Sequence, residues 1–123
     1  MATATDLMGL GTAPGLAELT GNSPQAVTAA GTAATTATAL APQASFLNVT
    51  AAGSQDGIRF HASTPLGRPI FIINVSGTTA KIYPATGGAI NGGSTDAAVD
   101  VATAKTAVVI RYSTTVWGLI LTA

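Results

Sequence analysis

The sequence predicts an all-β protein, which we expect to be a small antiparallel barrel or a jelly-roll-like sandwich with an extended N-terminal arm. Two observations predict this class. From residue 45 onward, apolar and polar residues alternate in short stretches rich in Val, Ile and Phe, with the two-residue period of a strand. Turn-forming residues separate these stretches about every 8 to 12 residues, a spacing typical of sandwiches and small barrels.

The chain divides into an N-terminal arm, residues 1–24, and a β-domain, residues 25–123. The arm mixes Leu and Met with Gly and Pro, and Asp6 and Pro14 could each begin a short turn. Such turns are too short to be stable alone in water, so the arm is either partly disordered or ordered only on a partner. Its candidate contacts with a partner are Leu7, Met8, Leu10, Leu16 and Leu19.

The first part of the β-domain, residues 25–40, consists mainly of Ala and Thr. Its imperfect alternation predicts two short strands, 25–30 and 34–40, joined at Gly31. Because Ala favours helices, a helix over this stretch is the alternative.

Four strands are expected in the middle of the domain, at residues 45–52, 56–63, 69–75 and 80–84. The third, PIFIINV, is mainly apolar and β-branched, which predicts a strand buried on both faces. The Ser-Gly-Thr-Thr sequence after it predicts a hairpin between the third and fourth strands.

A Gly-rich loop follows in the stretch KIYPATGGAINGG. The Asn91-Gly92 pair predicts a turn with positive φ. We interpret this loop as structural, with Tyr83 and Pro84 fixing the direction in which the chain leaves its strand. No Gly-Lys-Ser/Thr sequence and no helical pattern accompany the glycines, which argues against a phosphate-binding loop.

Three strands are expected after the loop, at 97–102, 106–113 and 116–122. The last two form a closing hairpin that contains Trp117. We expect this tryptophan and most other aromatic residues to pack in the core or between subunits. Tyr83 and Tyr112 could instead be exposed, and an exposed aromatic strip would fit a carbohydrate-binding module.

Charged residues make up 8% of the chain and the formal net charge is zero. An average soluble protein has about 25% charged residues, so a free monomer of this composition would tend to associate. The sequence has no cysteine and no cluster of Lys and Arg, which argues against disulfides, thiolate metal sites and nucleic-acid binding. Neither a secretion signal nor an apolar run long enough to span a membrane is present, so we expect no membrane partner.

The residues that could support catalysis are His61, Asp56 and Ser63. If they lie on one strand, His61 and Ser63 share a face but are about 7 Å apart, too far for a nucleophile and its base. We therefore expect a protein that is not an enzyme, with no catalytic residues.

Asn91, Asp96 and Asp100 could supply oxygen atoms to a cation, but their spacing does not match an EF-hand loop. We expect Asp96 to close a turn, Asp100 to face solvent, and the protein to hold no metal or cofactor. The two sequences that match the glycosylation motif, at 48–50 and 74–76, are expected to be chance matches in a chain rich in Thr and Ser.

The C-terminal half resembles a module found in virion structural proteins of tailed bacteriophages. The residues that carry the resemblance are GIRF (57–60), GRPIFIINVSGTTAKIYPATGGAINGG (67–93) and AAVDVATAKTAVVIRYSTTVWGLI (97–120). The most specific part runs from Tyr83 to Gly92, with Tyr-Pro-Ala-Thr-Gly followed by Ile-Asn-Gly. The Arg-Phe-His sequence that ends at His61 departs from the Arg-Leu-Pro of the pattern.

This resemblance implies a small head-decoration, or cement, protein. Such a protein would act as a homo-oligomer, which we expect to be a trimer, on the outer surface of the major capsid protein shell. It would be made in the cytoplasm of the bacterial host and be located on the capsid of the virion. Because similar modules occur in fibre and tail proteins, a tail, fibre or baseplate component is the alternative.

Overall fold

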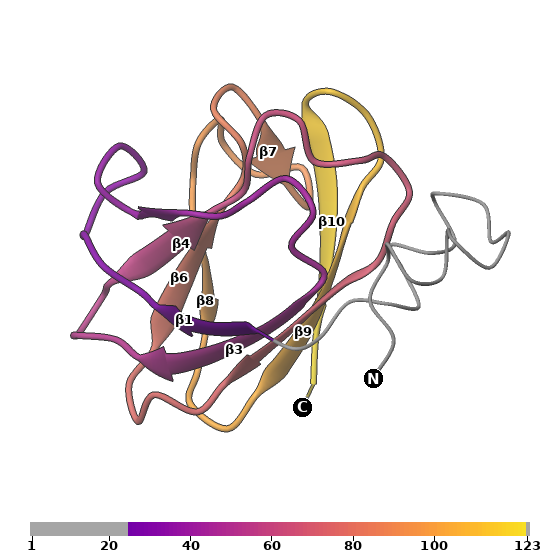
Figure 1. Ribbon diagram of the computed structural model, residues 1–123. Coiled ribbons are helices and arrows are strands. Elements are labelled where there is room, and N and C mark those ends of the chain that lie inside the picture. Colours follow the sequence, from indigo (N-terminus) through magenta and orange to yellow (C-terminus); the bar gives the residue numbers. More distant parts are fainter. Residues whose placement is uncertain (1–24, 123) are drawn as a thin grey trace, which may run out of the picture.

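The computed structural model describes residues 25–122, and Figure 1 shows the path of the chain. These residues form β-strands joined by turns and loops and contain no helix. The prediction of an all-β protein is therefore confirmed for the described part of the chain. The helix considered for residues 25–40 is absent.

The strands belong to two sheets that enclose the core. The six-stranded sheet has the spatial order β1 (Gln25–Thr28), β3 (Phe46–Ala51), β5 (Ile70–Asn74), β9 (Thr106–Arg111), β10 (Val116–Leu121) and β7 (Ala89–Ile90). The four-stranded sheet has the order β2 (Thr38–Ala39), β4 (Gly57–Arg59), β6 (Ala80–Tyr83) and β8 (Val99–Val101).

From β1 to β6 the chain moves alternately between the two sheets, so each circuit adds one parallel strand to each sheet. In the six-stranded sheet, Gln25 lies beside Leu47, which lies beside Ile72. In the four-stranded sheet, Thr38 lies beside Ile58, and Ile58 lies beside Ile82. This is a solenoid-like arrangement, because structurally equivalent residues recur once per circuit.

The later strands close one end of these circuits. β8 pairs antiparallel with β6, and β9 pairs antiparallel with β5. β10 forms the expected closing hairpin with β9, while the two-residue strand β7 pairs parallel with the outer side of β10. The sheets are therefore mixed.

The core lies between the sheets and is built by alternation along the strands. In β5, Ile70, Ile72 and Asn74 are buried, and the residues between them are exposed. Trp117 from β10 stacks on Phe60, which follows β4, with ring centroids 4.8 Å apart. This stack joins the six-stranded sheet to the chain that leaves the four-stranded sheet. The largest fully buried apolar side chains are Trp117, Ile58, Ile70, Ile72, Ile82, Val49, Val101, Val109 and Pro84.

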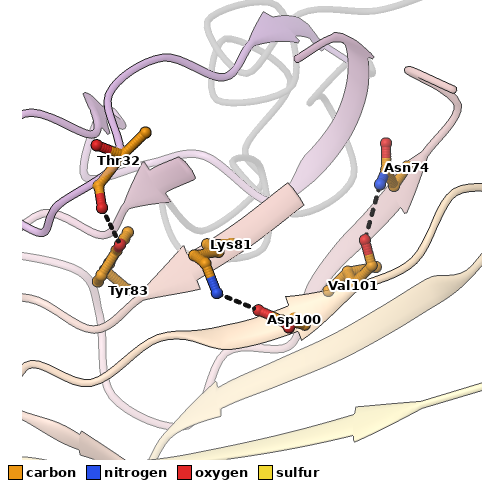
Figure 2. Close-up of polar contacts among 6 residues, drawn as sticks. All are labelled: Thr32, Asn74, Lys81, Tyr83, Asp100 and Val101. Atoms are coloured by element: carbon orange, nitrogen blue, oxygen red, sulfur yellow. Dashed lines mark hydrogen bonds and ion pairs between the residues drawn. The ribbon is translucent and has the colours of Figure 1, made fainter. Parts of the chain in front are cut away.

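Asn74, at the end of β5, is a fully buried polar link between the sheets. Its side-chain nitrogen donates to the carbonyl oxygens of Thr78 and Val101, both at 2.8 Å, and Val101 belongs to β8 (Figure 2). Its side-chain oxygen accepts from the amide and hydroxyl of Ser76. The side chain thus fixes the turn after β5 while satisfying buried main-chain groups.

The hairpin predicted between residues 69–75 and 80–84 is wrong. β5 and β6 lie in different sheets, and the turn between them carries the chain across the core. The predicted antiparallel pairing is also wrong for much of the structure, since the neighbours of β3 and β4 are parallel to them. Alternation and turn signals do not distinguish a hairpin from a crossing between sheets.

The prediction that residues 69–75 are buried on both faces is wrong as well, because Phe71 and Ile73 are exposed. The strand expected at 34–40 is reduced to Thr38–Ala39, and that expected at 56–63 is reduced to Gly57–Arg59. Before Thr38, Ala33 accepts main-chain hydrogen bonds from Thr36 and Ala37, which makes a turn of that segment.

We predict that Asn74→Ala lowers the free energy of unfolding by about 2–4 kcal/mol, because buried carbonyl groups lose their donor. Urea unfolding followed by the fluorescence of Trp117, which is buried, measures this change. The matched control is Asn48→Ala, since the side-chain oxygen of Asn48 has no hydrogen-bond partner. The control should change stability by less than about 1 kcal/mol. Equal losses in the two variants would contradict the role given to Asn74.

Candidate functional site: the outer face of the six-stranded sheet

The outer face of the six-stranded sheet is the most distinctive surface of the described chain. In β9, Ala107 and Val109 point into the core, so Thr106, Val108 and Ile110 point outward. The other strands alternate in the same way. The outer face comprises Phe46, Asn48, Phe71, Ile73, Thr106, Val108, Ile110, Tyr112, Val116, Gly118 and Ile120.

An apolar row crosses this face from strand to strand. Phe46 pairs with Phe71, Phe71 with Val108, and Val108 with Ile120. The rings of the two phenylalanines are stacked, with centroids 5.4 Å apart. Phe71 is 41% exposed and Ile120 is 72% exposed. Four neighbouring strands therefore present large apolar side chains to the surroundings in one line.

A hollow of about 220 Å³ lies at one side of this row. It is open to the surface and lined by Phe46, Leu47, Asn48, Phe71, Ile72, Ile73 and Thr106. Apart from Asn48 and Thr106, the lining consists of apolar side chains, so the hollow best suits an apolar group.

A second hollow, of about 290 Å³, lies at the other end of the outer face and includes Tyr112, Val116 and Gly118 in its lining. The ring of Tyr112 lies so close to Gly118 that a Cβ atom there would be 2.6 Å from the ring. Tyr112 is 66% exposed. The glycine thus creates a seat for an aromatic ring on the sheet surface.

None of the outward-pointing residues in the strands of the six-stranded sheet is charged. Arg111 belongs to β9 but is buried on the core side. The other charged side chains in residues 25–122 belong to the four-stranded sheet or to connections: Asp56, Arg59, Arg68, Lys81, Asp96, Asp100 and Lys105.

The outer face of the four-stranded sheet differs in two ways: it carries charged side chains, and another segment of the chain packs on it. Lys81 and Asp100, paired across β6 and β8, form an ion pair of 2.7 Å (Figure 2). Tyr83 lies against Gly57, and its hydroxyl group donates to the carbonyl oxygen of Thr32 at 3.4 Å. Arg59 donates to the carbonyl oxygen of Ala34. The 32–34 segment thus contacts the outer face of the four-stranded sheet. In residues 25–122, this face is polar, whereas the outer face of the six-stranded sheet is mainly apolar.

The Gly-rich loop that the sequence singles out packs against β10. Asn91 and Gly92 have φ angles of 54° and 73°, the positive values that the Asn-Gly pair predicts. The Asn91 side chain donates to the carbonyl oxygen of Leu119 and accepts from its amide, at 3.0 and 2.9 Å. It extends the pairing between β7 and β10 by one residue, which sequence reasoning did not foresee.

Trp117, expected in the core or between subunits, and Pro84, expected to direct the chain out of its strand, are both buried. Trp117 explains one glycine of the loop, because a Cβ atom on Gly88 would lie 2.8 Å from the indole nitrogen. Arg111 also lies over the indole ring, with its Cζ atom 5.1 Å from the ring centroid. The loop is thus shaped by close packing around the tryptophan.

The candidate catalytic residues are arranged differently from the sequence-based expectation. β4 ends at Arg59, so His61 and Ser63 lie in a turn rather than on one face of a strand. The Nδ1 atom of His61 accepts from the main-chain amide of Ser63 at 2.9 Å. Asp56 instead accepts from the amide of Gly53. The three residues do not form a relay from carboxylate to imidazole to hydroxyl.

The three oxygen-bearing residues considered for a cation are also engaged separately. Asp96 accepts from the amide of Gly87 at 2.7 Å and closes the loop, while exposed Asp100 pairs with Lys81. Asn91 contacts Leu119. Residues 25–122 contain no group of three or more His, Cys, Asp or Glu residues placed to hold a metal ion.

The asparagine of each glycosylation motif lies in a strand, Asn48 in β3 and Asn74 at the end of β5. Asn74 is fully buried and uses both atoms of its amide in internal hydrogen bonds, so it is inaccessible in the folded domain. The side-chain oxygen of Asn48 is also buried.

Two further expectations concern the aromatic residues and the arm. Tyr112 is exposed, as considered, but Tyr83 is buried, so the two do not form an exposed strip. The arm residues Leu7, Met8, Leu10, Leu16 and Leu19 lie outside the described residues.

Comparisons of this chain with protein-family models, with curated proteins and with solved structures find no match. Within the described range, the structure has no helix with the length and apolar character needed to cross a membrane.

We predict that Asn91→Ala destabilises the domain by about 2–3 kcal/mol, because it loses two hydrogen bonds and places Ala at positive φ. Asn91→Gly loses the same bonds but tolerates the backbone angle, and should be less destabilising by about 1 kcal/mol. Thermal and urea unfolding of both variants separate these contributions. If the glycine variant is as unstable as the alanine variant, the positive φ does not contribute.

Proposed function

We propose that this protein is a bacteriophage capsid decoration protein. It binds the outer surface of the major capsid protein shell as a homo-oligomer, for which the resemblance suggests three copies, and it stabilises the head. Its location is the virion surface, after synthesis in the cytoplasm of the bacterial host. The role is structural and not catalytic.

The observation that supports this proposal most directly is the uncharged outer face of the six-stranded sheet. Soluble monomers rarely expose large contiguous apolar patches, and such patches commonly mark contacts with other proteins. The row from Phe46 to Ile120 is such a patch, and the charged side chains lie elsewhere. In a subunit of a larger assembly, such a surface favours association, because contact with another subunit removes it from water.

The arm supplies the proposed contact with the capsid. Its five large apolar residues, Leu7, Met8, Leu10, Leu16 and Leu19, stand mainly among Gly, Ala and Thr, and the arm contains only two charged residues, Asp6 and Glu18. Apolar burial contributes about 25 cal/mol per Å² removed from water, so contacts across capsomer boundaries would raise the cost of separating capsomers. Because the same contact would be repeated by every copy on the shell, even a small stabilisation per copy would add up to a large stabilisation of the head.

Modules similar to the C-terminal half also occur in fibre and tail proteins of bacteriophages. A tail, fibre or baseplate component is therefore a variant of the same structural role. A carbohydrate-binding module is the second candidate, favoured by exposed Tyr112 on its glycine seat. In that case Tyr112→Ala should abolish retention on immobilised polysaccharides without loss of the fold. Unchanged retention, or none in the parent protein, would exclude a sugar site centred on this ring.

We predict that removal of residues 1–24 abolishes binding to empty heads while the β-domain remains folded. Co-sedimentation with heads measures binding, and circular dichroism together with Trp117 fluorescence measures folding. The matched control is the full chain with Leu7, Met8, Leu10, Leu16 and Leu19 replaced by Ser, which should also fail to bind. Undiminished binding of the truncated protein would rule out the arm as the capsid contact.

A further inference from the structure

The outer face carries both a projecting side chain and a hollow. Ile120 on β10 projects, being 72% exposed, and the 220 Å³ hollow lies around Phe46, Phe71 and Ile73 on β3 and β5. β9 separates β10 from β5, so these strands are about 10 Å apart. Ile120 therefore does not fill the hollow of its own chain.

We propose that the outer face of the six-stranded sheet binds a second copy of this chain, with Ile120 of one copy seated in the hollow of the next. The inference rests on the proposed function in one respect, namely that the protein acts as a homo-oligomer. It goes further by assigning the surface through which the copies meet.

Volume supports this fit. At about 30 Å³ for each water molecule, the hollow has room for about seven waters, which is ample for the four carbon atoms of an isoleucine side chain. The contact would also cover the stacked rings of Phe46 and Phe71. Burial of these side chains supplies the driving force.

The charge pattern favours an identical partner. The outer face has no charged residue in its strands that could form an ion pair with a charged group of a partner. A charged group buried against this face would lose its hydration without gaining an ion pair, which costs free energy. A second copy presents the same uncharged face and therefore meets this requirement. The opposite sheet, with the Lys81–Asp100 ion pair, is a poorer match.

The size of the face indicates how strong the association should be. Six strands about 4.8 Å apart give a width of about 24 Å, and six residues give a length of about 20 Å. The resulting area, about 500 Å² if the face is treated as flat, is below the roughly 800 Å² per partner of a standard interface. We therefore expect an oligomer that dissociates on dilution to low micromolar concentrations.

Light scattering after size exclusion tests the proposal on the full chain. The parent protein should have a mass of at least two 12.0 kDa chains at high concentration, and Ile120→Asp should reduce it to one chain. Because Ile120 is exposed, the variant should keep the parent's circular dichroism and unfolding midpoint. The control is Leu66→Asp, the same type of change at an aliphatic residue that is 59% exposed in the connection after β4. It should leave the mass unchanged.

A cross-linking experiment tests directly whether position 120 of one copy meets position 73 of another. The chain has no cysteine, so Ile120→Cys chains can be mixed with tagged Ile73→Cys chains and oxidised. A disulfide requires Cα atoms within about 7 Å of each other. Disulfides between unlike chains should form at least tenfold faster than in the control mixture of Leu66→Cys with Ile73→Cys.

Three results would overturn the proposal: a monomeric parent protein at high concentration, an oligomer that Ile120→Asp leaves intact, or cross-linking no faster than in the control. These results are independent of the capsid-binding test. Loss of head binding on removal of residues 1–24 could still support decoration by a monomer. Conversely, a protein that fails to bind heads but shows the expected cross-link would retain this self-contact.

Discussion

The buried guanidinium group of Arg111 is the constraint around which one end of the domain is organised. Burying a cation costs several kcal/mol unless hydrogen bonds satisfy it. Here the group donates to the carbonyl oxygens of Ala62, Thr64, Ser113 and Thr114, and no carboxylate is among its described partners. The same group lies over Trp117, which stacks on Phe60. One side chain thus holds the connection after β4, the hairpin from β9 to β10, and the aromatic stack between the sheets.

Aromatic rings on glycine seats give the two sheets different surfaces. Tyr83 lies on Gly57, and because the 32–34 segment contacts it, this face of the four-stranded sheet is partly covered from within the chain. Tyr112 lies on Gly118 and remains exposed. Close approach of ring to backbone is possible in both places only because the glycine lacks a Cβ atom. The two seats differ in what lies above the ring: within residues 25–122, the 32–34 segment contacts Tyr83, whereas Tyr112 stays exposed.

The sequence was sufficient for the all-β class, the closing hairpin and the Asn91-Gly92 turn, because alternation and turn chemistry are local signals. It was not sufficient for the topology, since a turn after Asn74 can lead back along the same sheet or across to the other. One signal could have revealed the circuits: Phe-Leu-Asn-Val at 46–49 and Gly-Ile-Arg at 57–59 are followed, about 25 residues later, by Phe-Ile-Ile-Asn and Lys-Ile-Tyr in equivalent positions. The outer face was missed because Phe71 and Ile73 are as apolar as their buried neighbours, and only the pairing of strands shows which face water reaches.

The circuits of the chain differ in length although their equivalent strands remain paired. In the six-stranded sheet, the residue beside Gln25 is 22 positions later, whereas the residue beside Leu47 is 25 positions later. In the four-stranded sheet, the corresponding separations from Thr38 and Ile58 are 20 and 24 positions. The connections absorb these differences, so the architecture already accommodates insertions of several residues. Foreign peptides placed in these connections would be displayed at fixed positions on the scaffold, and natural variants could lengthen there without repacking the core.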